Sequence, residues 1–203
     1  MDHDYVYTAT VAYEQCCNWF GKPEDYHWSY TLQRFARSGC VRSTLYKEYI
    51  IAVNKSYKYP EQIKATLCRE MYYRVTMTRN TIRKHPWLDE VLATLTKYHC
   101  MVVLGYPDYA NYSLHYDTAN DVMLKPKQLK RIRRRRLCSW FTKDGFPSGY
   151  GITIRKLAIK ALENLTWDTM RRAVNSASFE DWLNNIEQSE RNTVVNLFGE
   201  YFV

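Results

Sequence analysis

The helical character of this chain is predicted most clearly by residues 86–95, which read Pro-Trp-Leu-Asp-Glu-Val-Leu-Ala-Thr-Leu. Proline suits the first turn of a helix, because the backbone nitrogen has no intrahelical partner there. Large apolar side chains then recur three or four residues apart, at Trp87, Leu88, Val91, Leu92 and Leu95. This spacing places them on one face of a helix. The stretch therefore predicts a buried amphipathic helix.

Similar spacing precedes this stretch along most of the chain. Residues 4–20 carry apolar side chains at helical steps, and Gly21 is expected to end that helix. We expect a short helix at residues 28–38, a second one capped by Ser43, and a third that starts at Pro60. Residues 1–98 are therefore predicted to form an N-terminal helical bundle.

The periodicity changes after this region. Residues 99–104 read His-Cys-Met-Val-Val-Leu and stop at Gly105, which is typical of a short buried strand. Apolar and polar residues alternate over residues 112–117, and residues 118–121 are typical of a turn. We therefore expect a small central antiparallel sheet within residues 99–124.

The last region, residues 125–203, is predicted to hold C-terminal helices. Pro126 is expected to start a basic helix, and residues 142–151 to form a loop. A further helix is expected from Ile154, and Ser178 can cap another in an acidic helical tail. The predicted fold class is α+β, predominantly helical, with all three regions in one compact unit.

Composition narrows the class of protein. Hydrophobic residues make up 46% and charged residues 25%, which is close to the average of soluble globular chains. We find no apolar run long enough to cross a membrane and no apolar leader after Met1. The six cysteines lack the spacing of a zinc site, so we expect reduced thiols, mostly buried, in a cytoplasmic protein.

The net charge of +8 is distributed very unevenly. Residues 1–124 hold 14 basic and 13 acidic residues, and residues 161–203 hold 3 basic and 7 acidic residues. Residues 125–160 hold 12 basic and 1 acidic residue. One segment therefore carries more than the whole excess of positive charge, and its field attracts polyanions.

The centre of this segment, residues 125–141, reads Lys-Pro-Lys-Gln-Leu-Lys-Arg-Ile-Arg-Arg-Arg-Arg-Leu-Cys-Ser-Trp-Phe. On a helix its apolar residues would span an arc of about 180°. Arg133 and Arg136 fall inside that arc. Either such a helix is only partly buried, or these two arginines meet a partner.

Arginine suits phosphate because its planar group donates two parallel hydrogen bonds and keeps its charge. Aromatic residues add stacking on single-stranded bases. We therefore predict a non-enzymatic protein that binds DNA or RNA through an Arg/Lys-rich helix and loop. The candidate nucleic-acid-binding residues are Lys127, Lys130, Arg131, Arg133, Arg134, Arg135, Arg136, Trp140, Lys143, Arg155 and Lys156.

Two other interpretations of the basic segment stay open. It can face an acidic protein surface, as in a protein-binding inhibitor or adaptor, including a phage or viral accessory factor that acts on host nucleic-acid or defence machinery. It can also pair with acidic residues of this chain's own tail, namely Glu180, Asp181, Glu187 and Glu190.

The sequence offers little for catalysis. His115 and Asp117 would share a face of a predicted strand, which suits acid–base chemistry but is more often a surface hydrogen bond. The His99-Cys100 and Cys16-Cys17 pairs are better explained as buried structural residues. We expect no enzymatic activity, no metal and no cofactor.

Overall fold

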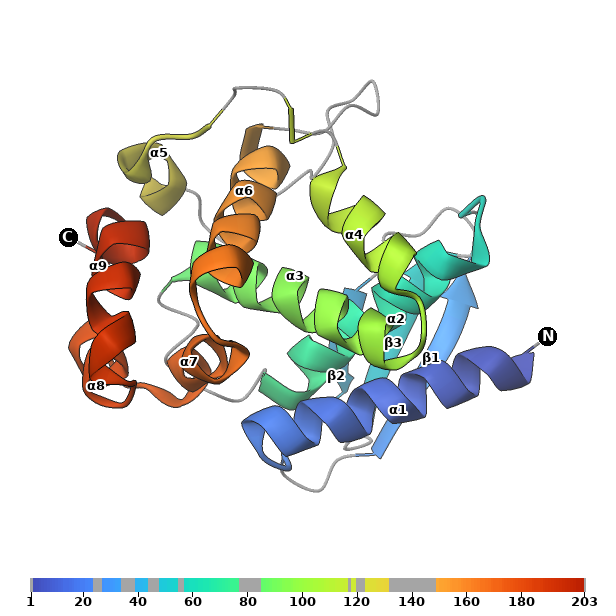
Figure 1. The fold of residues 1–203 in the computed structure, drawn as a ribbon. Coiled ribbons are helices and arrows are strands. Elements are labelled where there is room, and N and C mark those ends of the chain that lie inside the picture. The colour runs from blue at the N-terminus through green and yellow to red at the C-terminus, as the bar shows by residue number, and fades with distance from the viewer. Residues whose placement is uncertain are drawn as a thin grey trace. The chain divides into compact units, whose positions relative to one another are not determined.

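The structure is a computed structural model (Figure 1). It describes residues 2–23, 27–33, 39–43, 48–54, 57–76, 85–116, 118–119, 123–131 and 149–202. Its elements are α1 (Asp2–Phe20), β1 (His27–Gln33), β2 (Gly39–Ser43), β3 (Glu48–Asn54), α2 (Pro60–Thr76), α3 (Pro86–Val103), α4 (Pro107–His115), α5 (Pro126–Arg131), α6 (Gly149–Asn164), α7 (Trp167–Arg172), the 3₁₀ turn η2 (Ala173–Asn175), α8 (Phe179–Asn184) and α9 (Gln188–Phe202). The predicted class, α+β and mostly helical, is confirmed.

Local signals placed several helix ends correctly, but α6 begins at Gly149, inside the loop predicted at residues 142–151 and before the helix start predicted at Ile154. Three prolines, Pro60, Pro86 and Pro126, are the first residues of α2, α3 and α5, as expected for a residue without a backbone N–H. Gly21 ends α1 with a φ of +86°, a conformation that glycine adopts at no steric cost. The Ser178 side chain caps α8 by accepting a hydrogen bond from the backbone nitrogen of Asp181.

The sheet lies in a different part of the chain from the one predicted. Its strand order is β1-β3-β2, with β1 parallel and β2 antiparallel to β3. The predicted helices at residues 28–38 and after Ser43 are therefore wrong, as is the purely antiparallel orientation. In β3, Ile51 and Val53 are buried while Ile50 and Ala52 are half-buried. This alternation has the period of a strand.

The predicted sheet at residues 99–124 is also wrong within the described residues. Residues 99–103 are the last turn of α3, and residues 112–115 belong to α4. The backbone nitrogen of Tyr106 donates to the oxygen of Met101 at 2.8 Å, and Gly105 has a φ of +85°. This pattern closes a helix at its carboxyl end. The apolar run at 99–104 therefore continues a helix instead of starting a strand.

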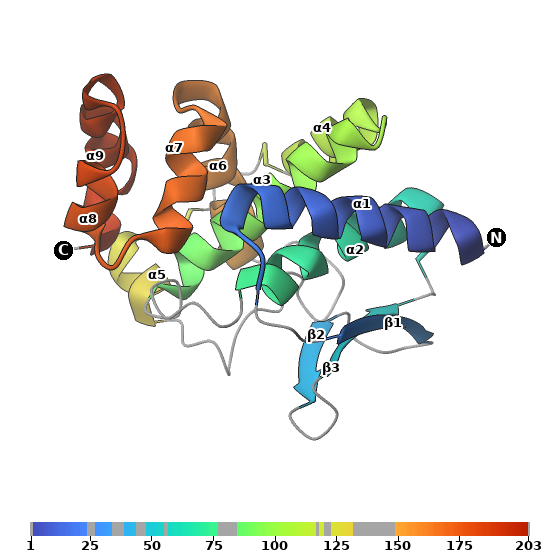
Figure 2. The same ribbon diagram turned by 90° about the horizontal axis from the view of Figure 1, so that it is seen from below.

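The chain folds into two compact units. The first comprises residues 1–78 and 96–111, and the second comprises residues 79–95 and 112–203. In the first unit, α2 packs against α1 and against the sheet, as Figure 2 shows. In the second unit, α9 packs against α5, α6 and α8. The buried core of the second unit includes Trp87, Leu92, Leu129, Ile154, Trp182, Val194 and Phe198.

None of the described helices combines the length and the apolar character that a membrane span requires.

Candidate nucleic-acid interface

The helix α5 carries the first described part of the basic segment. The side-chain oxygen of Gln128 accepts a hydrogen bond from the backbone nitrogen of Lys125 at 2.8 Å, which satisfies a donor at the start of the helix. The backbone nitrogen of Leu124 donates to Thr153 Oγ1 of α6 at 2.8 Å. Leu129 is buried, and α5 packs against α9. The basic residues of α5 are thus held on a packed scaffold.

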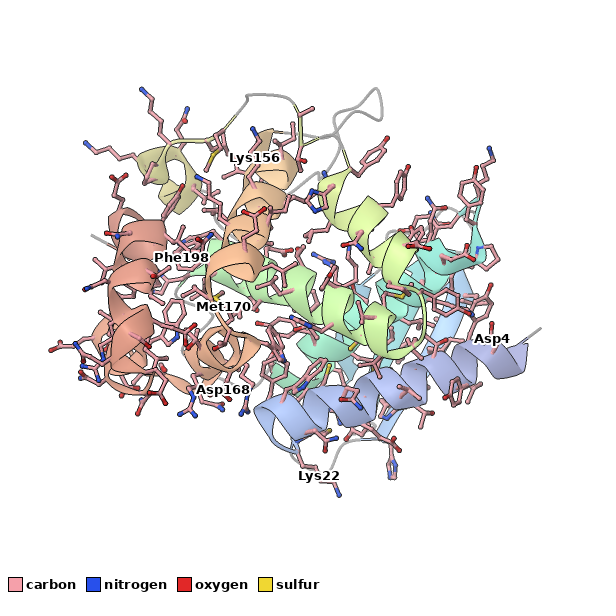
Figure 3. All side chains as sticks on the ribbon, viewed as in Figure 1. Asp4, Lys22, Lys156, Asp168, Met170 and Phe198 are labelled. Carbon is pink, nitrogen blue, oxygen red and sulfur yellow. The ribbon has the colours of Figure 1, made fainter. Side chains whose placement is uncertain are left out.

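Four lysines of α5, its entry and α6 reach solvent. Lys125, Lys127 and Lys160 are exposed, and Lys156, labelled on α6 in Figure 3, is half-buried. Among the described residues, no carboxylate forms an ion pair with any of these ammonium groups. The only acidic residue of α5 and α6 is Glu163. These two helices therefore present positive charge that the described chain does not neutralise.

Much of the predicted site lies beyond the described residues. The backbones of Lys130 and Arg131 belong to α5, but their side chains are outside the description. The remaining predicted residues outside the described ranges are Arg133, Arg134, Arg135, Arg136, Trp140 and Lys143. Of the predicted binding residues, the structure thus describes the side chains of Lys127, Arg155 and Lys156.

Arg155 does not lie on the surface where the prediction placed it. The residue is only 6% exposed, and its Nη1 donates to the backbone oxygen of Tyr116 at 3.3 Å. Its guanidinium carbon lies 5.7 Å from the centroid of the Tyr116 ring, within range of a cation–π interaction. Arg155 faces inward because α6 uses that side to hold the end of α4. Among the described residues, Arg155 is therefore a buried residue in contact with Tyr116.

Two tyrosines at the end of α4 form a feature that the sequence did not predict. Tyr112 and Tyr116 are 59% and 40% exposed, and their ring centroids are 5.7 Å apart. Residues four apart are neighbours on a helix surface. The spacing of four residues between Tyr112 and Tyr116 is the sequence signal for this contact on a helix. The alternation of apolar and polar residues over 112–117 instead favours a strand, and that prediction concealed the signal.

Two carboxylates of the acidic tail accept hydrogen bonds at helix ends within the tail. Asp181 accepts hydrogen bonds from the backbone nitrogen of Ala177 at 2.6 Å and from the side chain of Asn185 at 3.1 Å. Glu190 accepts hydrogen bonds from the backbone nitrogen of Thr166 at 2.7 Å and from the hydroxyl of Thr169. These carboxylates therefore serve local caps. The other two acidic candidates, Glu180 and Glu187, are exposed.

A polar cleft of about 470 Å³ lies where the ends of α7 and α8 meet the start of α9. Arg172 lines it and donates to Asp168 at 2.6 Å and to the backbone oxygen of Asn185 at 3.0 Å. The hydrogen bond from Arg172, aided by Arg171, lowers the pKa of the Asp168 carboxyl despite partial desolvation. Arg191 and Glu187 also line the cleft, so its charges balance. Balanced charge gives no field that would gather a polyanion.

The catalytic candidates are not brought together. His115 is exposed in the last turn of α4, so the strand that would have aligned it with Asp117 is absent, and Asp117 lies outside the described residues. Burial lowers the pKa of His99 to about 4. A hydrogen bond with Cys16 and desolvation raise the pKa of Cys100. At neutral pH this neighbouring pair is therefore a neutral imidazole and a thiol.

In the described ranges, no three histidine, cysteine or acidic side chains are grouped so as to hold a metal ion. Comparisons with protein-family models, with curated proteins and with solved structures find no match for this chain.

Proposed function

We propose that this protein binds DNA or RNA through the basic segment at residues 125–160 and catalyses no reaction on it. The observation that carries the proposal is the concentration of 12 basic residues against 1 acidic residue in this segment. The exposed ammonium groups of Lys125, Lys127 and Lys160 support it, since no described carboxylate pairs with them.

The affinity in this proposal comes from phosphate neutralisation. A nucleic acid carries a layer of condensed counterions, and each phosphate that a lysine or arginine neutralises releases some of them. Binding is therefore strong at low salt and falls steeply as the salt concentration rises. This contribution does not depend on base sequence, so the basic segment alone predicts affinity and not sequence specificity.

The main competing interpretation of the charge is internal pairing with the acidic tail. Asp181 and Glu190 already accept hydrogen bonds at the starts of α8 and α7. A carboxylate held in a cap keeps its charge but has fewer acceptor positions to offer a guanidinium. This use leaves Glu180 and Glu187 as the tail candidates for internal pairing, and neither forms an ion pair with a described lysine of the segment.

The proposal is tested by titrating labelled single- and double-stranded oligonucleotides with the full chain at low and high salt. The variant Lys127→Ala/Lys160→Ala removes two exposed charges from the segment. The matched control, Lys22→Ala/Lys58→Ala, removes two exposed charges from outside it. We expect the first variant to bind more weakly than the control at the same salt concentration.

Two results would contradict the proposal. If the wild-type chain binds no oligonucleotide at low salt, it is not a nucleic-acid-binding protein. If both double variants weaken binding equally, the attraction comes from net charge and not from this segment. In the first case, a partner that stays bound after nuclease treatment would favour the alternative of an acidic protein surface.

A further inference from the structure

The two exposed tyrosines at the end of α4 are connected to α6. Tyr112 and Tyr116 contact each other edge to face, with an angle of 61° between their ring planes. Arg155 of α6 holds Tyr116 through its guanidinium group, which bonds to the backbone oxygen and lies against the ring. The tyrosine pair is therefore anchored to the helix that carries Lys156 and Lys160.

The helix that holds Tyr116 also carries positive charge. Consecutive side chains of a helix project about 100° apart, so Lys156 lies to one side of Arg155 and does not share its direction. Lys160 follows one turn later and is exposed. In Figure 1, α6 lies beside the carboxyl end of α4, as the hydrogen bond from Arg155 to Tyr116 requires. A single strand several nucleotides long that contacts Tyr116 can therefore extend along α6 to these lysines.

We propose that Tyr112 and Tyr116 form a stacking platform for the bases of a single-stranded nucleic acid. This inference rests on the proposed function and narrows it to one class of partner. A single strand can turn its bases onto aromatic rings while its phosphates contact lysines. The bases of a duplex are already stacked on each other, so this platform has nothing to bind in a duplex. An acidic protein can also pack on tyrosines, but it would give no preference for a base-containing strand over an abasic one, which the test below measures.

The contacts of Tyr116 with Arg155 and Tyr112 support this proposal. A ring whose position is restricted by contacts loses less conformational freedom when a base stacks on it. Isolated exposed tyrosines are common on protein surfaces and need no explanation. Here the ring pair, the Arg155 guanidinium near the Tyr116 ring and the α6 lysines that no described carboxylate pairs with belong to one part of the second unit. Positive charge favours a polyanion, and the exposed rings favour one that carries bases.

The test compares three labelled ligands of equal length: a single strand, its duplex and an abasic single strand. The abasic strand keeps the phosphates and lacks the bases. We expect the wild-type chain to bind the base-containing single strand more tightly than the abasic one. Each base that stacks on an aromatic ring is worth between about fivefold and about 140-fold in affinity.

The variants separate stacking from charge. Tyr112→Ala should reduce or abolish the preference for the base-containing strand, whereas Tyr112→Phe should keep it, because a phenyl ring also stacks. Tyr7→Ala is the matched control, since Tyr7 is 63% exposed on α1. DNA and RNA strands of the same sequence are used in parallel, because both carry the bases and phosphates that this site recognises.

The outcomes distinguish this inference from the proposed function. If the wild-type chain binds all three ligands equally, or Tyr112→Ala behaves like Tyr7→Ala, the stacking platform is wrong and charge-driven binding through residues 125–160 remains. If no ligand binds at low salt, both the platform and the proposed function are wrong.

Discussion

Nη1 of Arg155 donates a hydrogen bond to the backbone oxygen of Tyr116 over a distance of 3.3 Å. The two residues are 39 positions apart in the sequence, and the bond joins α6 to the end of α4 within the second unit. The basic segment thus contains at least one cation whose role is internal. The same arginine also lies near the ring of Tyr116, one of the two rings that we propose for base stacking.

We expect Arg155→Ala to destabilise the protein. The substitution removes a buried side chain that donates a charged hydrogen bond, and the loss should be about 1 to 3 kcal/mol in the free energy of unfolding. Lys156→Ala is the matched control, because a partly exposed lysine without a described partner should cost no more than about 0.5 kcal/mol. Urea denaturation of both variants checks this. Equal losses would contradict the structural role of Arg155.

The salt dependence of binding should separate the lysines from the tyrosines. Log affinity falls linearly with log salt concentration. For a single strand, each lost phosphate contact makes this slope less steep by about 0.7. We expect Lys127→Ala/Lys160→Ala to lower this slope by up to about 1.4. Tyr112→Ala should weaken binding at every salt concentration without changing the slope. A change of slope in the tyrosine variant would contradict a neutral stacking contact.

The Glu190 carboxylate should make stability depend on pH in the acid range. Desolvation would raise the pKa of this carboxyl, but hydrogen bonds from Thr169 and Thr166 outweigh it and hold the pKa below 4.5. The folded state therefore favours the charged form. The stability that the folded state gains from the charged Glu190 carboxylate is fully present above pH 4.5, the ordinary pKa of the group. This stability is lost as the pH falls through the lower pKa of the folded state.

We therefore expect Glu190→Gln to be less stable than the wild type at pH 7, with a difference that shrinks as the pH falls below 4.5. Urea denaturation over a pH series measures this difference. Glu163→Gln is the control, because Glu163 is exposed on α6 and should leave stability nearly unchanged. A difference that stays constant with pH would show that the charge of Glu190 is unimportant.

Buried cysteines in the first unit should resist alkylation in the folded protein. Cys16, Cys68 and Cys100 are buried, whereas Cys17 is half-buried. A hydrogen bond with Cys100, together with burial, raises the pKa of the Cys68 thiol, so little reactive thiolate is present at neutral pH.

Among these four cysteines, iodoacetamide should modify Cys17 first, as mass spectrometry of the digested protein would show. The same reaction in urea should modify all four. Modification of Cys68 or Cys100 at the same rate with and without urea would contradict their burial.

The errors of sequence interpretation have specific causes. β3 spans seven residues, and over so short a length the apolar residues Ile50, Ile51 and Val53 fit a helix as well as a strand. The opposite error occurred at residues 99–104, where an apolar run longer than one turn concealed the end of a helix. In both cases the elements that pack against the segment decide its conformation. The difference in propensity between helix and strand is smaller than the free energy that burial of the apolar side chains contributes.

The sequence by itself determined the helix starts at Pro60, Pro86 and Pro126, the end of α1 at Gly21, and the concentration of charge in residues 125–160. Proline and glycine act through their own backbone geometry, and the net charge of a segment does not depend on its fold. Only the tertiary structure decided that Arg155 faces inward and that Tyr112 and Tyr116 reach solvent. Exposure depends on which elements pack together, and that packing joins residues far apart in the chain.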